Sequence, residues 1–221
     1  MTSSDEERLV GTISAERFQP FLKACGGDRT MALRLYAWDA EAARALSSPL
    51  RDLEVSLRNA LNLQLAGRFK QADWWTLPKA EPSTWAMKEI WNAEDALARR
   101  RKPYGPSDIV AKLSFGFWTG LLGKGGNYEM KYWYPSLRHR FPGQNRQSLH
   151  DRLEVMRTLR NRIAHHERIS HRHLDQDFRS AVELMRLVSP ELAARHEKYS
   201  QVPSVLTRKA RVLSGEEEIV L

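Results

Sequence analysis

The stretch LRDLEVSLRNALNLQL (residues 50–65) decides the fold of this chain. Its leucines recur at three- and four-residue intervals, at positions 50, 53, 57, 61 and 65, and polar side chains lie between most of them. That spacing places the leucines on one face of an α-helix, and this face must be buried against other helices. Ser48-Pro49 is a favourable helix start, so the sequence predicts a helix from there to about Phe69.

Helical periodicity continues on both sides of this stretch. Upstream, Ser14 and Asp28 can cap two helices that Gly26-Gly27 separates, and the second should end before Ser47-Ser48. Downstream we expect helices over about residues 107–122, 148–168 and 174–188, followed by a short one that restarts at Ser189-Pro190. No run of alternating β-branched residues favours a sheet. The sequence therefore predicts an all-α helical bundle.

Two segments interrupt the helical pattern. Residues 70–106 contain several prolines and tryptophans, which indicates a loop-rich insertion around one short helix near 87–99. We expect the tryptophans at 74, 75, 85 and 91 to be core residues, although such rings can also stack on bases. Beyond Ser200 the pattern fades. We therefore expect one domain over residues 1–200 and an irregular C-terminal tail over 201–221.

Composition narrows the cellular setting and the partners. Lys and Arg number 35 and Asp and Glu 27, a net charge of +8, which favours a polyanionic partner. The basic residues cluster, for example at Arg99-Arg100-Arg101-Lys102 and around residues 152–172. A single cysteine, Cys25, fits a reducing cytoplasm, so we expect a cytoplasmic protein. No apolar stretch is long enough to cross a membrane, and no membrane association is expected.

The stretch LRNRIAHHER (residues 159–168) concentrates arginine, asparagine and histidine side chains that can take part in catalysis. On a helical wheel Arg160, Asn161 and His165 form one polar arc facing away from the core stripe. His166 falls at the edge of that stripe, where a structural role is natural. A guanidinium can hold a phosphate and stabilise charge on its oxygens, and an imidazole can move protons near neutral pH.

Two other interpretations of this stretch are open. A solvated helix face would carry no function, but the density of arginine and the shortage of acidic partners argue against it. A metal site is the second alternative, built from histidines and Glu167. However, His166-Glu167-Arg168-Ile169-Ser170-His171 has one residue too many for the H-E-x-x-H spacing. We therefore expect no metal and no other cofactor.

Residues 159–167 resemble the signature of Abi-like proteins, bacterial abortive-infection proteins of the HEPN superfamily. Residues 36–39 and 53–60 resemble the N-terminal helices of that family, and residues 113–122 are similar to its central Ser-Phe-Gly-x-Trp segment. The blocks follow the family's order over roughly residues 30–170. Asp39 stands where the family pattern has Asn.

The resemblance implies a helical bundle of HEPN type and metal-independent cleavage of RNA, as a toxin or anti-phage effector. Arg160 and His165 would be the catalytic pair, with Asn161 as the polar residue that follows the arginine. RNA would be the substrate, and the site would form in a homodimer that brings two motif helices together. An antitoxin or a phage component could control it.

Further basic residues near the motif are candidates for RNA contact, namely Arg157, Arg162, His166 and Arg168. The alternative is a non-catalytic helical module of the same fold that binds RNA or a partner protein, because the same arginines could position a phosphate backbone without chemistry.

Overall fold

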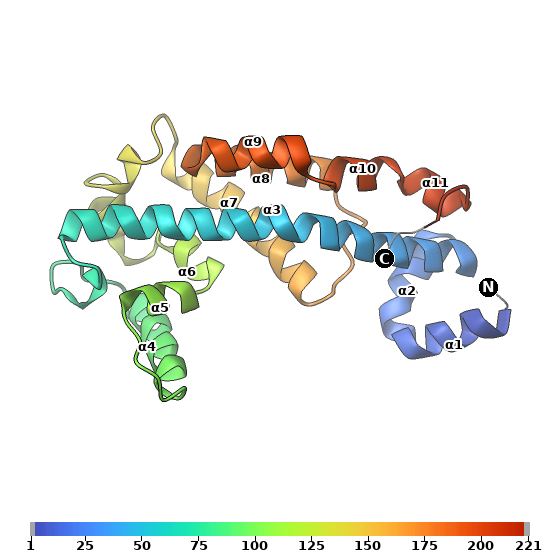
Figure 1. Ribbon diagram of the computed structural model, residues 1–221, viewed down its shortest axis with the longest axis horizontal. Helices are drawn as coiled ribbons and strands as arrows, with labels where there is room; N and C mark the ends of the chain where they lie inside the picture. The colour runs from blue at the N-terminus through green and yellow to red at the C-terminus, as the bar shows by residue number, and fades with distance from the viewer. Residues whose placement is uncertain (1–2, 219–221) are drawn as a thin grey trace. The chain divides into compact units, whose positions relative to one another are not determined.

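Residues 3–218 are described by the computed structural model, and they contain helices and no strand (Figure 1). The all-α fold class is therefore confirmed. The α-helices are α1 (Ser3–Ile13), α2 (Ala15–Ala24), α3 (Arg29–Phe69), α4 (Thr84–Ala98), α5 (Pro106–Lys112), α6 (Phe115–Gly120), α7 (Arg146–Ala164), α8 (Leu174–Val188), α9 (Pro190–Tyr199), α10 (Val202–Thr207) and α11 (Lys209–Ser214). Short 3₁₀ and π turns connect several of them, the first at Trp74–Thr76. None of the helices within the described range has the length and apolar character that a membrane span requires.

The chain divides into two compact units where the sequence predicted one domain with a tail. The first unit takes its described residues from segments 1–49, 159–179 and 196–221, and the second from 50–158 and 180–195. Helices α3, α7, α8 and α9 each contribute residues to both units. The expectation of a single domain over residues 1–200 stays a prediction beside this division into compact units.

Helix α3 runs without a break through the position where the sequence predicted a new start. Pro49 lies inside the helix, although its ring removes one backbone donor. The Ser47 hydroxyl donates to the Ala43 carbonyl within the helix at 2.8 Å. The buried face is continuous across this point, since Leu46 and Leu50 are both at most 1% exposed. Burial of this long apolar face outweighs the one hydrogen bond that proline removes.

The C-terminal segment is not an irregular tail. Helices α10 and α11 bury Val202, Val205 and Val212 within the first unit. The buried Trp38 indole donates to the Val205 carbonyl at 3.0 Å. The buried valines lie three and seven residues apart. Because the helices around Pro203 are short, this spacing does not form a sustained helical pattern in the sequence.

In the second unit, α4 and α5 lie side by side (Figure 1). The helix predicted over 107–122 is two helices, because Leu113 is extended and Ser114 caps α6 by accepting from the Phe117 amide at 3.2 Å. Trp74 and Trp75 are buried, as the sequence predicts. Trp85 and Trp91 are not core residues, since they are 45% and 57% exposed.

Candidate functional site

The candidate motif lies at the C-terminal end of α7. Asn145 caps the start of this helix by accepting from the Ser148 amide at 3.1 Å, so the helix begins slightly earlier than the predicted residue 148. The predicted end at residue 168 is wrong, because regular helix stops at Ala164. His165 and the residues after it therefore belong to a loop.

A Schellman motif ends the helix. The Glu167 amide donates to the Arg162 carbonyl at 2.8 Å, and the His166 amide donates to the Ile163 carbonyl at 3.1 Å. His166 occupies the left-handed position, with φ 56°, where glycine is the usual residue. Its imidazole is exposed and does not lie at the core edge that the helical wheel predicted.

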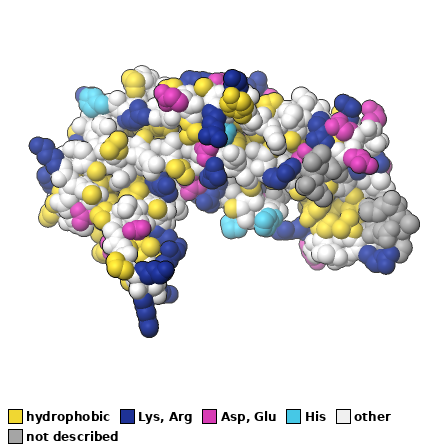
Figure 2. All heavy atoms as spheres, viewed as in Figure 1, with side chains coloured by type: hydrophobic (Ala, Val, Ile, Leu, Met, Phe, Trp, Pro, Cys, Tyr) yellow, Lys and Arg dark blue, Asp and Glu magenta, His cyan; other side chains and the backbone are white. Residues whose placement is uncertain are grey.

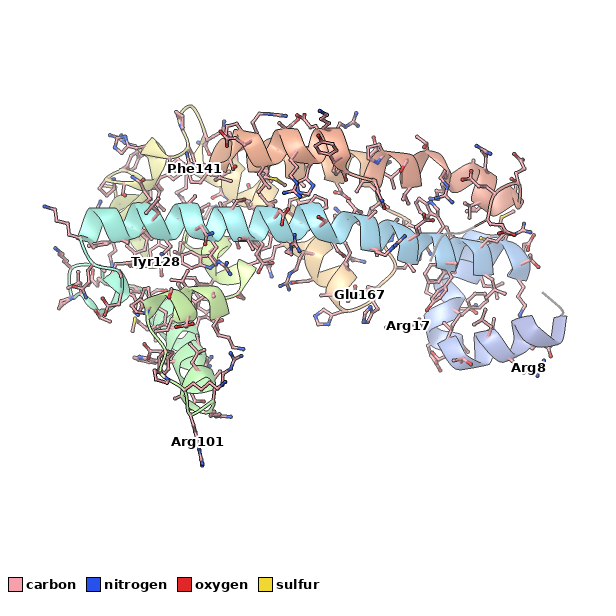
Figure 3. All side chains as sticks on the ribbon, in the orientation of Figure 1. Arg8, Arg17, Arg101, Tyr128, Phe141 and Glu167 are labelled. Carbon is pink, nitrogen blue, oxygen red and sulfur yellow. The ribbon has the colours of Figure 1, made fainter. Side chains whose placement is uncertain are left out.

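The backbone around His165 is held while its ring is exposed. The His165 amide donates to the Asn161 carbonyl at 2.9 Å, so His165 keeps its helical register one turn beyond Asn161. Arg17, on α2, donates through Nη2 to the His165 carbonyl oxygen at 3.5 Å. Figure 3 shows Glu167 in the loop after α7 and Arg17 on α2. A fixed backbone with an exposed ring suits a group that must meet a large substrate.

Arg160 and Asn161 are half-buried on the last turns of α7. Arg160 Nη1 lies 3.4 Å from Asn161 Oδ1, a long hydrogen bond between neighbouring side chains. The Asn161 amide oxygen can therefore orient the Arg160 guanidinium without neutralising its charge. The structure thus places Arg160 and Asn161 in contact and puts His165 in helical register with Asn161.

Asp39 anchors the loop that follows His165, a role that the sequence comparison did not suggest. Its Oδ1 accepts from the Ile169 amide at 3.0 Å and the Ser170 amide at 2.6 Å. The Asp39 residue is only 6% exposed, and burial raises the pKa of its carboxyl above the ordinary value. Lys209 on α11 donates to the Ser170 carbonyl oxygen at 3.1 Å.

The predicted RNA-contact arginines have structural partners. Arg157 pairs with Glu154 at 2.6 Å, and Arg162 lies 3.7 Å from Glu167. Arg168 donates to the Pro20 carbonyl, and its guanidinium lies 5.6 Å from the centre of the Phe21 ring. The Arg168 contacts tie the loop after α7 to α2.

The expected shortage of acidic partners is wrong for much of the basic cluster around the motif. Beyond Arg157 and Arg162, Arg152 pairs with Glu183 at 2.8 Å and Arg172 with Asp177 at 2.7 Å. Glu183 lies 31 residues from Arg152, so residue spacing could not reveal that pair, whereas the i,i+3 spacing of Glu154 and Arg157 is visible in the sequence. The density of arginine near the motif therefore carries less functional weight than the sequence predicts.

A cavity of about 370 Å³ lies beside the loop in the first unit. Cationic and imidazole side chains line it from three elements, namely Arg17, Arg44 and His166. Its other polar lining residues are Tyr36, Asp39, Ser47 and Glu167. The cavity has room for part of a nucleotide and carries groups that can hold a phosphate.

The histidines of the motif region do not form a recognisable metal centre. No group of three or more His, Cys, Asp or Glu side chains in the described range could hold a metal ion. Burial lowers the pKa of His171, and Arg162, Arg168 and Arg172 lower it further. The imidazole, guanidinium and amide groups at the loop can transfer protons and contact phosphate.

Searches of protein-family models, curated proteins and solved structures found no significant match to this chain.

Proposed function

We propose that this protein is a metal-independent endoribonuclease of HEPN type that acts as a toxin or anti-phage effector. The resemblance of residues 159–167 to the Abi-like signature motivates the proposal. The observation that carries it is the exposed imidazole of His165 on a backbone held by Asn161 and Arg17. The Arg160–Asn161 contact places a guanidinium on the preceding turn.

In this mechanism the RNA 2′-hydroxyl attacks the adjacent phosphorus. His165 accepts the hydroxyl proton or donates one to the departing 5′-oxygen. Arg160 holds the non-bridging oxygens as their charge grows, and Asn161 orients Arg160. The P–O5′ bond breaks, which leaves a 2′,3′-cyclic phosphate and a 5′-hydroxyl. A second protomer would supply another copy of these groups, so that one imidazole could accept while the other donates.

The test is cleavage of end-labelled RNA by the purified protein in the presence of EDTA. Arg160→Ala and His165→Ala should abolish cleavage while leaving the circular dichroism spectrum unchanged. His139→Ala is the matched control, because it removes an exposed imidazole that lies outside the motif. This control should cut RNA as the parent does.

The substrate itself provides a second control. A substrate with a single 2′-deoxynucleotide at the cleaved position should resist, because the attacking hydroxyl is gone. Cleavage by His165→Ala at the parental rate would refute the proposal. Salt-sensitive binding that leaves RNA intact would instead favour the non-catalytic binding module.

A further inference from the structure

Helix α4 presents two opposite faces with different chemistry. Its buried face consists of Ala86, Ile90, Ala93 and Leu97. With about 100° of rotation per residue, Lys88, Trp91, Asp95 and Arg99 fall within roughly 80° on the other side. All four are exposed, and the Trp91 side chain is 57% exposed. The outer face of α4 therefore carries a large aromatic ring between two cations.

The turn after α4 continues this face with further positive charge. Arg100, Arg101 and Lys102 are exposed, and Figure 3 shows Arg101 at the tip of the hairpin that α4 and α5 form. Figure 2 shows dark blue basic side chains gathered at the same end. Among residues 3–218 the structure gives these three residues no acidic partner. They differ in this respect from four basic residues around the motif that pair with carboxylates, namely Arg152, Arg157, Arg162 and Arg172.

The ion pair between Arg99 and Asp95 on this surface is weak. Arg99 pairs with Asp95 at 2.6 Å, but the two side chains are 79% and 61% exposed. An exposed pair on one helix contributes little, so Arg99 can exchange its carboxylate for a phosphate at small cost. Four cations at consecutive positions, 99–102, are therefore able to contact a polyanion.

We propose that the outer face of α4 and the turn at residues 99–102 bind single-stranded RNA. A base stacks on the exposed Trp91 ring, and the cations at 99–102 contact the phosphates. A protein partner fits less well, because the exposed neighbours of Trp91 on this face, Lys88, Asn92 and Asp95, are polar. Duplex RNA fits less well because its paired bases cannot offer a free face to Trp91.

This inference rests on the proposed function in that RNA is the substrate, but binding can be measured without cleavage. The probe is a fluorescent, unstructured RNA in which every 2′-hydroxyl is methylated, so that no 2′-hydroxyl attack can cut it. Its affinity for the full chain is followed by anisotropy across a range of salt concentrations. A methylated duplex serves as the comparison.

The charge test uses the triple variant Arg100→Gln/Arg101→Gln/Lys102→Gln. The slope of log affinity against log salt should fall by about 2, because each single-strand phosphate contact contributes about 0.7. The matched control is Arg186→Gln/Arg195→Gln/Lys198→Gln, which removes three exposed cations from α8 and α9. Equal losses in the two variants would show that binding follows net charge alone and would overturn the proposal.

The stacking test uses Trp91→Ala, with Tyr199→Ala as the matched loss of an aromatic ring that is 69% exposed. Trp91→Ala should weaken single-strand binding about 5- to 150-fold, the range for loss of one stacked base, and should spare the duplex. Trp91→Phe should retain part of the affinity. Unchanged single-strand binding by Trp91→Ala would overturn the proposal and leave this face to a protein partner. Parental RNA cleavage by His165→Ala would refute the catalytic role proposed for His165 and leave this result standing.

Discussion

Replacing Asp39 by alanine should release the loop that carries the candidate site. Asp39 Oδ1 is the acceptor for two backbone amides, those of Ile169 and Ser170, which are 0% and 7% exposed. A buried donor without an acceptor costs about 1–3 kcal/mol, so the variant should lose about 2–6 kcal/mol of unfolding free energy. That is a large share of the total of about 5–15 kcal/mol for a typical domain.

The assay is urea unfolding followed by circular dichroism, and Asp39→Asn is the control. The asparagine oxygen can accept from the same two amides without the cost of a buried charge, so this variant should lose about 1 kcal/mol or less. With an m value of about 2 kcal/mol/M, Asp39→Ala should shift the midpoint by about 1 M or more. Equal and small losses in the two variants would show that the loop amides find other acceptors, and would refute the anchoring role.

The two variants also differ in their pH dependence. The folded-state pKa of Asp39 is raised by burial, so the folded protein holds this proton more tightly than the unfolded chain does. The contribution of Asp39 to stability therefore falls as pH rises from the ordinary aspartate range through the folded-state pKa. Asp39→Asn should remove that decline.

Three further predictions concern other parts of the fold. His166→Gly should raise the unfolding free energy by about 1 kcal/mol in urea titrations, because glycine adopts the left-handed backbone without strain; a loss of stability would contradict the Schellman assignment. Hydrogen bonds from Arg157 and Thr119 overcome the effect of burial and hold the pKa of Glu154 below its ordinary value. Glu154→Gln should therefore destabilise the protein near pH 7, with a difference that shrinks as pH falls through the folded-state pKa, measured by melting temperature. Deletion of residues 201–221 should expose Trp38 and lower the melting temperature, since the packing of α10 and the hydrogen bond from the Trp38 indole are lost; an unchanged melting temperature would show that this segment is dispensable.

Local signals in the sequence predicted much of the helical structure. Ser14 caps α2, Asp28 accepts from the Met31 amide at 2.8 Å, and α8 spans the predicted residues 174–188. Caps and apolar periodicity act within a few residues, so a single sequence can reveal them. Ser48-Pro49 was misleading because a proline tolerated inside α3 looks the same as a proline that starts a helix.

The sequence identified the residues of the candidate site, but it did not predict where the helix ends or which distant residues hold the loop. The stretch 159–168 located Arg160, Asn161 and His165, yet the helix stops before His165 because His166 takes a conformation that usually signals glycine. Asp39 and Lys209 reach the loop from segments far away in the chain. Hydrogen bonds between distant segments leave no periodic signal, and neither does the long-range ion pair of Arg152 with Glu183.

The interleaving of the first unit has a consequence for the order of events during synthesis. A ribosome releases the chain from its N-terminus, and residues 1–49 emerge long before the segments that complete their core. Asp39 can accept its two backbone hydrogen bonds only after residues 169–170 have been synthesised, and the Trp38 indole can donate only after Val205 has been synthesised. The loop bearing His165 acquires its last tether only when Lys209 leaves the ribosome, so a nascent chain cannot assemble this region ahead of its final helices.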